Sequence, residues 1–372
     1  MAAKPDIIIS YTALKSLVEK FLASDIDTDT VAITCTFRRA MREFKTLYPT
    51  LYYFAYGMGK EYTLVLSKNK FEIEFKCLTP KCKKIFIDNA GLRIVPTISD
   101  ALVKRLDPYL NLRNWFALLS DVMHFVGGEK EFISKHFDLQ SQIVEDIKKS
   151  PAYNAWKDLV VTPKKLSYTQ KPVAGSDVKP TYSNKGLSNN IYCIENNGKY
   201  FMSIDLKAAN FQVLRTNGLI TEKTWPEYTA KFINHPYFGR LKVLRMKILS
   251  DPALYPSKQS ALWSNTTLDI LSSIIERGVM NEEDFAIWNS DEIVFHVDKE
   301  SMAGAKVKCT DYLKKYFPDL DLEVNVFQLQ HVDKTKQYFA KIDQTTNKID
   351  FKCANAQEFP HAVELWNRNF NN

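Results

Sequence analysis

The spacing of apolar residues in the first part of the chain predicts helices around one hairpin. Helical spacing extends over residues 11–23 and 36–48, and the stretch EYTLVLSKNKFEIEFK alternates on either side of a polar turn, as a β-hairpin does. Three more helices are expected, over residues 98–106, 112–125 and 129–149. We therefore predict a separate α+β domain over residues 1–160.

The pattern changes after residue 160. Residues 161–190 are rich in lysine and proline with a single acidic residue, so this segment cannot build a core and is predicted to be a linker or a long loop. From residue 191 on, the order is strand, helices, paired strands, helix and strand, which is the βαββαβ order of a ferredoxin-like sheet. We assign this second domain to residues 191–335, and a C-terminal hairpin with a short helix to residues 336–372.

The individual elements of the second domain are also marked by the pattern. The Asn-Gly pair in IYCIENNGKYFMSID predicts a tight turn between two strands, because both turn positions favour positive φ. Paired strands are expected within residues 284–297, and a last strand in LEVNVFQLQHV. Helices are expected over residues 222–233, 238–249, 257–277 and 301–317.

Composition places the chain among globular proteins with a mild preference for polyanions. Apolar residues make up 45% of the chain, which is enough to fill hydrophobic cores, and the formal net charge of +7 suits a polyanionic partner. The first residues lack the pattern of a secretory signal, and no run reaches the roughly twenty apolar residues of a membrane span. We expect a soluble intracellular protein, cytoplasmic or nuclear, with no membrane partner.

Three carboxylates interrupt the apolar pattern of the predicted strands. Asp205 ends the strand in YFMSIDLKAANF, and Asp291 with Glu292 lies between the apolar runs of FAIWNSDEIVFHV. Buried carboxylates are costly unless they are paired or bound to a metal. In a ferredoxin-like sheet the first strand and the central hairpin are neighbours, so we expect the three acids to converge and bind Mg²⁺ or Mn²⁺. Two such ions about 4 Å apart support nucleotidyl transfer.

Simpler interpretations of these residues stay open. Asp205 and Asp291 could cap helices or bind lysines instead of a metal. Glu292 could face solvent, because neighbouring strand residues point to opposite faces of a sheet. His296 follows four residues after Glu292, and an ordinary role within the strand explains it better than metal binding.

Three stretches resemble motifs of the palm domain of right-handed polymerases. IDLKAANF resembles motif A, most closely the form found in many reverse transcriptases, and NSDEIVF resembles motif C. Its Ser-Asp-Glu form is also similar to enzymes of the tRNA-His guanylyltransferase type, which share the palm. LYPSKQSALWSNTTLDIL lies where reverse transcriptases place motif B, although the usual glycine after proline is missing. The resemblance covers about residues 186–340.

The resemblance implies a nucleic-acid polymerase or a related nucleotidyltransferase. Such an enzyme adds nucleotides from NTP or dNTP to an RNA or DNA end with two Mg²⁺ or Mn²⁺ ions, and it can have protein partners in a polymerase assembly. Two alternatives are a nucleotide cyclase with a palm fold and a non-catalytic nucleic-acid-binding subunit of a replication or transcription complex. By position, the catalytic metal ligands would be Asp205, Asp291 and Glu292.

The resemblance also implies roles for residues near the motifs. Asn210 or Phe211 falls where such enzymes sense the 2′ position of the sugar. The nucleotide-binding residues as a group would be Leu206, Lys207, Asn210, Phe211, Lys258 and Gln259.

A basic stripe on a predicted N-terminal helix gives a candidate nucleic-acid contact. Arg38, Arg42 and Lys45 recur at helical spacing, opposite apolar positions. In a polymerase this helix would belong to a fingers-like domain that contacts phosphates. A solvated helix face with no function explains the same stripe.

Overall fold

The computed structural model describes most of the chain. The described residues are 16, 19–20, 30–35, 52–56, 62–67, 75, 78–168, 182–183, 186–187, 191–333 and 338–370. The chain divides into two compact units, and each is described by itself. The first unit contains residues 1–86, 99–107 and 111–134, and the second contains residues 87–98, 108–110 and 135–372.

The first unit contains an antiparallel sheet with the strand order β1-β3-β2. These strands are Thr30–Cys35, Tyr52–Tyr56 and Tyr62–Ser67, so β3 coincides with the first strand of the predicted hairpin. In the same unit the ring of Phe75 stacks on that of Phe116, with 4.8 Å between the centroids. The predicted helix over residues 36–48 lies outside the described residues, and so does most of the one over residues 11–23.

The helices predicted up to residue 149 are confirmed where the structure describes them. Asn111 separates two of them with a left-handed φ of 52°, a conformation that asparagine tolerates, and its N–H donates to the Asp107 carbonyl. The helical segments are α4 (Pro80–Ala90), α5 (Asp100–Leu110), α6 (Leu112–Val126), α7 (Glu129–Lys148) and α8 (Tyr153–Asp158). The sequence pattern had not indicated α4 or α8.

The second unit is built on a six-stranded antiparallel sheet within its described part, with the order β11-β10-β9-β6-β8-β7. The α+β class predicted from the sequence is therefore confirmed. In chain order, β6 is followed by helices, the hairpin β7–β8, a helix and β9. The strands are β6 (Tyr200–Leu206), β7 (Phe285–Asn289), β8 (Glu292–Val297), β9 (Leu322–His331), β10 (Phe339–Asp343) and β11 (Ile349–Lys352).

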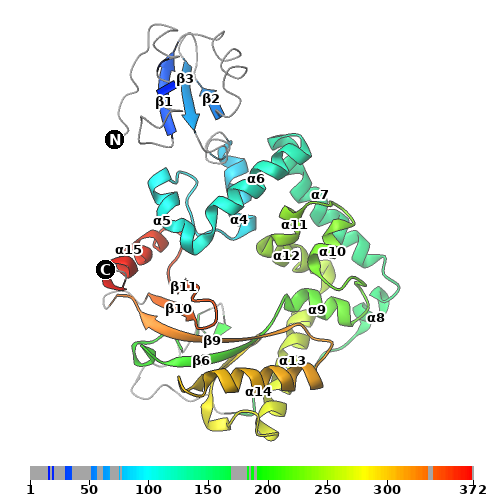
Figure 1. Ribbon diagram of the computed structural model, residues 1–372. Coiled ribbons are helices and arrows are strands. Elements are labelled where there is room, and N and C mark those ends of the chain that lie inside the picture. The colour runs from blue at the N-terminus through cyan, green and yellow to red at the C-terminus, as the bar shows by residue number, and fades with distance from the viewer. Residues whose placement is uncertain are drawn as a thin grey trace. The chain divides into compact units, whose positions relative to one another are not determined.

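Two long helices cover one face of this sheet (Figure 1). They are α13 (Pro256–Glu276) and α14 (Met302–Tyr316), which match the helices predicted over 257–277 and 301–317. Alternation along β6 turns Met202 and Ile204 toward them, and both side chains are buried. The residues that alternate with these two along β6, Asp205 among them, therefore point to the other face.

Shorter helices connect β6 to α13. The predicted helix over 222–233 corresponds to α10 (Trp225–Ala230). The one predicted over 238–249 is divided into α11 (Pro236–Arg240) and α12 (Lys242–Leu249). Directly after β6 comes α9 (Ala209–Thr216), which the sequence pattern had not indicated.

The prediction of a strand before the Asn-Gly turn is wrong. The chain forms a 3₁₀ turn at Ile194–Asn196 instead. The side-chain amide of Asn196 donates to the Ile191 carbonyl at 2.9 Å, and the N–H of Gly198 donates to the Leu329 carbonyl at 2.7 Å. The start of β6 therefore pairs with β9, and the preceding residues are held by local bonds.

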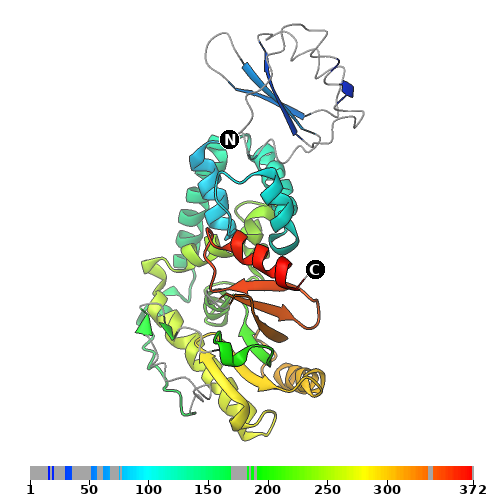
Figure 2. The ribbon, with the colours of Figure 1, turned by 90° about the vertical axis from the view of Figure 1, so that its left-hand side faces the viewer.

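The C-terminal hairpin β10–β11 and the final helix α15 (Phe359–Phe370) confirm the prediction for the tail. Figure 2 shows α15 lying along this hairpin, where Phe351 packs edge-on against Phe359 and Trp366. Arg93 donates to the Phe351 carbonyl and lies 2.5 Å from the Asp350 carboxylate, which ties the hairpin to residues 87–98 of the same unit. Among the described helices, none has the length and apolar character needed to cross a membrane.

Candidate active site

Asp205 lies near the end of β6 with an acidic residue opposite it on each side. Its register partner on β8 is Glu292, and its partner on β9 is Glu323. Residues directly opposite one another in a sheet share a face. The three carboxylates therefore lie on the face that α13 and α14 do not cover.

Asp291 reaches this place from the turn between β7 and β8. Ser290 takes a left-handed φ of 51°, and its carbonyl accepts a hydrogen bond of 2.6 Å from the Thr267 hydroxyl of α13. The N–H of Leu206 donates to the Asp291 carbonyl at 2.9 Å. A main-chain bond thus joins the two acidic segments. The structure brings Asp205, Asp291 and Glu292 together, with Asp291 in the turn and Glu292 as the first residue of β8.

The two acids that flank Asp205 are each paired with a lysine. Glu292 lies 3.4 Å from the Lys341 ammonium, and Glu323 lies 3.4 Å from the Lys207 ammonium. No described residue donates a hydrogen bond to the Asp205 carboxylate. The sequence allowed an ion pair with lysine for Asp205 and Asp291. Among the described residues, the acids that form such pairs here are Glu292 and Glu323 instead.

Burial and the neighbouring charges make ionisation of the central acids costly. Desolvation, and then the charges of Glu292 and Asp291, raise the pKa of Asp205 to about 6, and Lys242 opposes this rise. Desolvation also raises the pKa of Asp291, followed by the charge of Glu292, and its own backbone N–H and Lys242 act against it. A cation bound here would relieve this repulsion.

A pocket of about 440 Å³ opens at this acidic end of the sheet. Asp205 and Asp291 lie on its wall, and Lys242 and Arg245 of α12 also line it. The Arg245 guanidinium is partly buried, desolvation lowers its pKa, and it has no hydrogen bond or ion pair with the residues that the structure describes. Further basic residues that line the pocket are Lys207, Arg215 and Lys223.

The motif A residues predicted to bind a nucleotide all line this pocket, with different exposure. Leu206 is buried, and Phe211 is buried against the rings of Trp225 and Tyr228. Asn210 is partly exposed, so its amide is the more accessible of the two candidates for the sugar position. Between the strand and α9, Ala208 takes a left-handed φ of 51°.

The motif B residues do not line the pocket. The ammonium of Lys258 donates to the carbonyls of Trp156 and Lys157, at 2.5 and 3.0 Å. The amide of Gln259 is buried and donates to the carbonyls of Leu249 and Leu254, both at 2.9 Å. In this structure both side chains hold the start of α13. Three other candidates, Arg38, Arg42 and Lys45, lie outside the described residues.

The donor set at Asp205 suits a hard divalent cation. Within the described part of the chain, no group of three or more His, Cys, Asp or Glu side chains is arranged to hold a metal ion. Mg²⁺ is often bound by one or two carboxylates together with substrate phosphates. Asp205 and Asp291 fit this mode, whereas Glu292, expected from the sequence as a ligand or its support, is engaged by Lys341.

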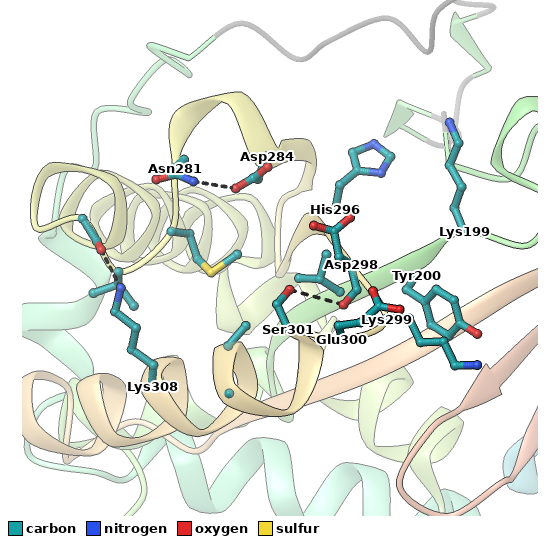
Figure 3. A pocket seen from close by; sticks show the side chains of 16 residues that line it. Lys199, Tyr200, Asn281, Asp284, His296, Asp298, Lys299, Glu300, Ser301 and Lys308 are labelled. Carbon is teal, nitrogen blue, oxygen red and sulfur yellow. Dashed lines mark hydrogen bonds between the residues drawn. The ribbon is translucent and has the colours of Figure 1, made fainter.

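A second cavity, of about 810 Å³, lies between the start of β6, the end of β8 and the first turn of α14. Figure 3 shows its mixed lining, with Lys308 and Lys199 at opposite sides of the view and the acidic side chains of Asp298 and Glu300 between them. The Lys308 ammonium donates to the Gly278 carbonyl at 2.7 Å. None of the described residues predicted to act in catalysis or nucleotide binding lines this cavity.

Comparison of the chain with protein-family models, with curated proteins and with solved structures finds no match.

Proposed function

We propose that this protein is a palm-type nucleotidyltransferase that adds nucleotides from NTP or dNTP to an RNA or DNA end. The observation that carries the proposal is the meeting of Asp205 and Asp291 at a pocket that Lys242 and Arg245 also line. The neighbour order β9-β6-β8-β7 and the chain order strand, helices, two strands, helix, strand support a ferredoxin-like palm.

The charges in the pocket suit a nucleoside triphosphate with its metal ions. A cation bound by Asp205 and Asp291 would polarise the α-phosphate and favour ionisation of the attacking hydroxyl. Arg245 is suited to the triphosphate because its desolvated guanidinium can donate several charge-assisted hydrogen bonds. Lys242 adds positive charge close to both acids. In this proposal, Asp205 and Asp291 form the cation-binding part of the site, and Arg245 belongs to its phosphate-binding part.

The test is incorporation of labelled nucleotides on a panel of primed and unprimed RNA and DNA templates, with Mg²⁺ and with chelator. We expect Asp205→Asn and Asp291→Asn to lower incorporation by about 100-fold or more, as the removal of a preorganised electrostatic group does. Asp311→Asn is the matched control, because Asp311 is an exposed residue of α14 outside the pocket. Circular dichroism checks that all three variants fold.

The same assay separates the proposal from its two rivals. A nucleotide cyclase would form product from triphosphate alone, without a primer. A non-catalytic subunit would bind nucleic acid without incorporating nucleotides under any condition. Full incorporation by both the Asp205→Asn and Asp291→Asn variants would refute the assignment of these residues.

A further inference from the structure

Lys341 lies outside the four strands that form the proposed palm, yet it contacts an acid at the active site. It belongs to β10, and its ammonium lies 3.4 Å from Glu292 of β8. The ammonium also lies 4.0 Å from the ring centroid of Phe327, a cation–π distance. The Lys341 and Glu292 side chains are 21% and 24% exposed, against 44% and 41% for Lys207 and Glu323. Water therefore screens the Lys341 pair less.

The geometry of this pair shows in which direction the Lys341 ammonium attracts the Glu292 carboxylate. Strands β9 and β6 lie between β10 and β8, and the two residues are also offset along the sheet, because Lys341 faces Leu329 of β9 whereas Glu292 is level with Asp205 and Glu323. Both side chains must therefore extend over the intervening strands. Phe327 is the register partner of Phe201, four residues before Asp205 on β6. The ammonium of Lys341 thus attracts Glu292 toward the middle of the sheet and away from the turn that holds Asp291.

We propose that Lys341 is a positioning residue that keeps Glu292 out of the cation site, so that Asp205 and Asp291 alone supply its protein carboxylates. The inference rests on the proposed function, because it concerns the cation of that reaction. The Lys341 charge also offsets one of three acids that share a register position, and Asp205 remains available as a ligand. Without this ammonium, Glu292 can turn toward Asp205 and add a third carboxylate.

Calorimetric titration of the full chain with Mn²⁺ tests this role without an activity assay. Lys341→Met removes the charge but keeps an apolar stem over Phe327. We expect it to tighten Mn²⁺ binding by about 3- to 10-fold, because a freed carboxylate adds a charged ligand. The double variant Lys341→Met with Glu292→Gln should return to the wild-type affinity within about twofold, since the freed carboxylate is then absent.

Two further variants separate positioning from general structural damage. Lys341→Arg keeps the positive charge and should keep the wild-type affinity. Lys348→Met is the matched control, because Lys348 is an exposed residue beside the same hairpin and no acid is paired with its side chain in the described structure. Thermal unfolding of each variant checks that it remains folded.

The outcomes distinguish this inference from the proposed function. If Mn²⁺ binding depends on Asp205 but does not change in Lys341→Met, the positioning role is overturned and the proposed function stands. The positioning role is also overturned if Glu292→Gln does not reverse the tightening. If the wild-type protein binds Mn²⁺ no better than Asp205→Asn, both the positioning role and the proposed metal site fail.

Discussion

Asp205→Asn is expected to raise the stability of the protein and, under the proposed function, to lower nucleotide incorporation. The pKa of this carboxyl rises from 3.8 to about 6 in the folded protein, mainly through desolvation. The difference is about 2, and at about 1.4 kcal/mol for each pKa unit, ionised Asp205 lowers the free energy of unfolding by about 3 kcal/mol at neutral pH. Asparagine has nearly the same shape and carries no charge, so the variant should regain about this amount.

The sign of the effect sets its pH dependence. Below about pH 4 the wild-type carboxyl is protonated in both the folded and the unfolded state, so it contributes no charge penalty. As the pH rises from about 4 to about 6, the unfolded state releases its proton first and wild-type stability falls relative to the variant. Above about pH 6 the full difference is present. The advantage of Asp205→Asn should therefore grow between these values and then stay constant.

Urea unfolding of the two proteins, followed by tryptophan fluorescence at about pH 4 and about pH 7.5, measures this difference. Added Mg²⁺ should raise the unfolding temperature of the wild type and leave that of Asp205→Asn nearly unchanged, because binding to the folded state alone stabilises it. Asp311→Asn should behave like the wild type in both experiments. Equal stability of wild type and Asp205→Asn at about pH 7.5, or an advantage of the same size at both pH values, would refute the reasoning.

Two other predictions concern the surroundings of the acids. Arg245→Ala should weaken nucleoside triphosphate binding by about 10- to 100-fold in a fluorescence titration, because it removes charge-assisted hydrogen bonds; an equal loss in Arg240→Ala, outside the pocket, would contradict this. Thr267→Val removes the 2.6 Å bond to the Ser290 carbonyl and the 2.9 Å bond from the Trp288 indole. It should lower the free energy of unfolding by about 1–2 kcal/mol and reduce incorporation, whereas Thr266→Val, whose hydroxyl bonds within α13, should change incorporation little.

The sequence was sufficient to predict elements in which the apolar spacing repeats regularly over many residues. Helix α14 follows the predicted apolar face, with Cys309 and Leu313 buried. The convergence of Asp205 and Asp291 also followed, because the chain order of strands and helices restricts which strands can be neighbours. Helix α9 was missed because eight residues contain too few turns for a clear helical period.

Other features depend on contacts that no local pattern contains. Glu323 was missed as a neighbour of Asp205 because its place depends on the register between β6 and β9. Its alternation with buried Val324 in β9 was the available signal, since it places Glu323 on the face away from the helices. The residues before the Asn-Gly turn were assigned to a strand because the turn signal was strong. The bond from Asn196 to Ile191 favours a compact turn there instead.

The bond between the Leu206 N–H and the Asp291 carbonyl has a practical consequence. Since backbone atoms join the two acidic segments, asparagine at either position leaves this connection in place. Both asparagine variants should therefore keep the shape of the pocket and its basic side chains. Under the proposed function, such variants would be suitable for substrate trapping, in which a nucleotide and a nucleic-acid end are co-crystallised before they can react.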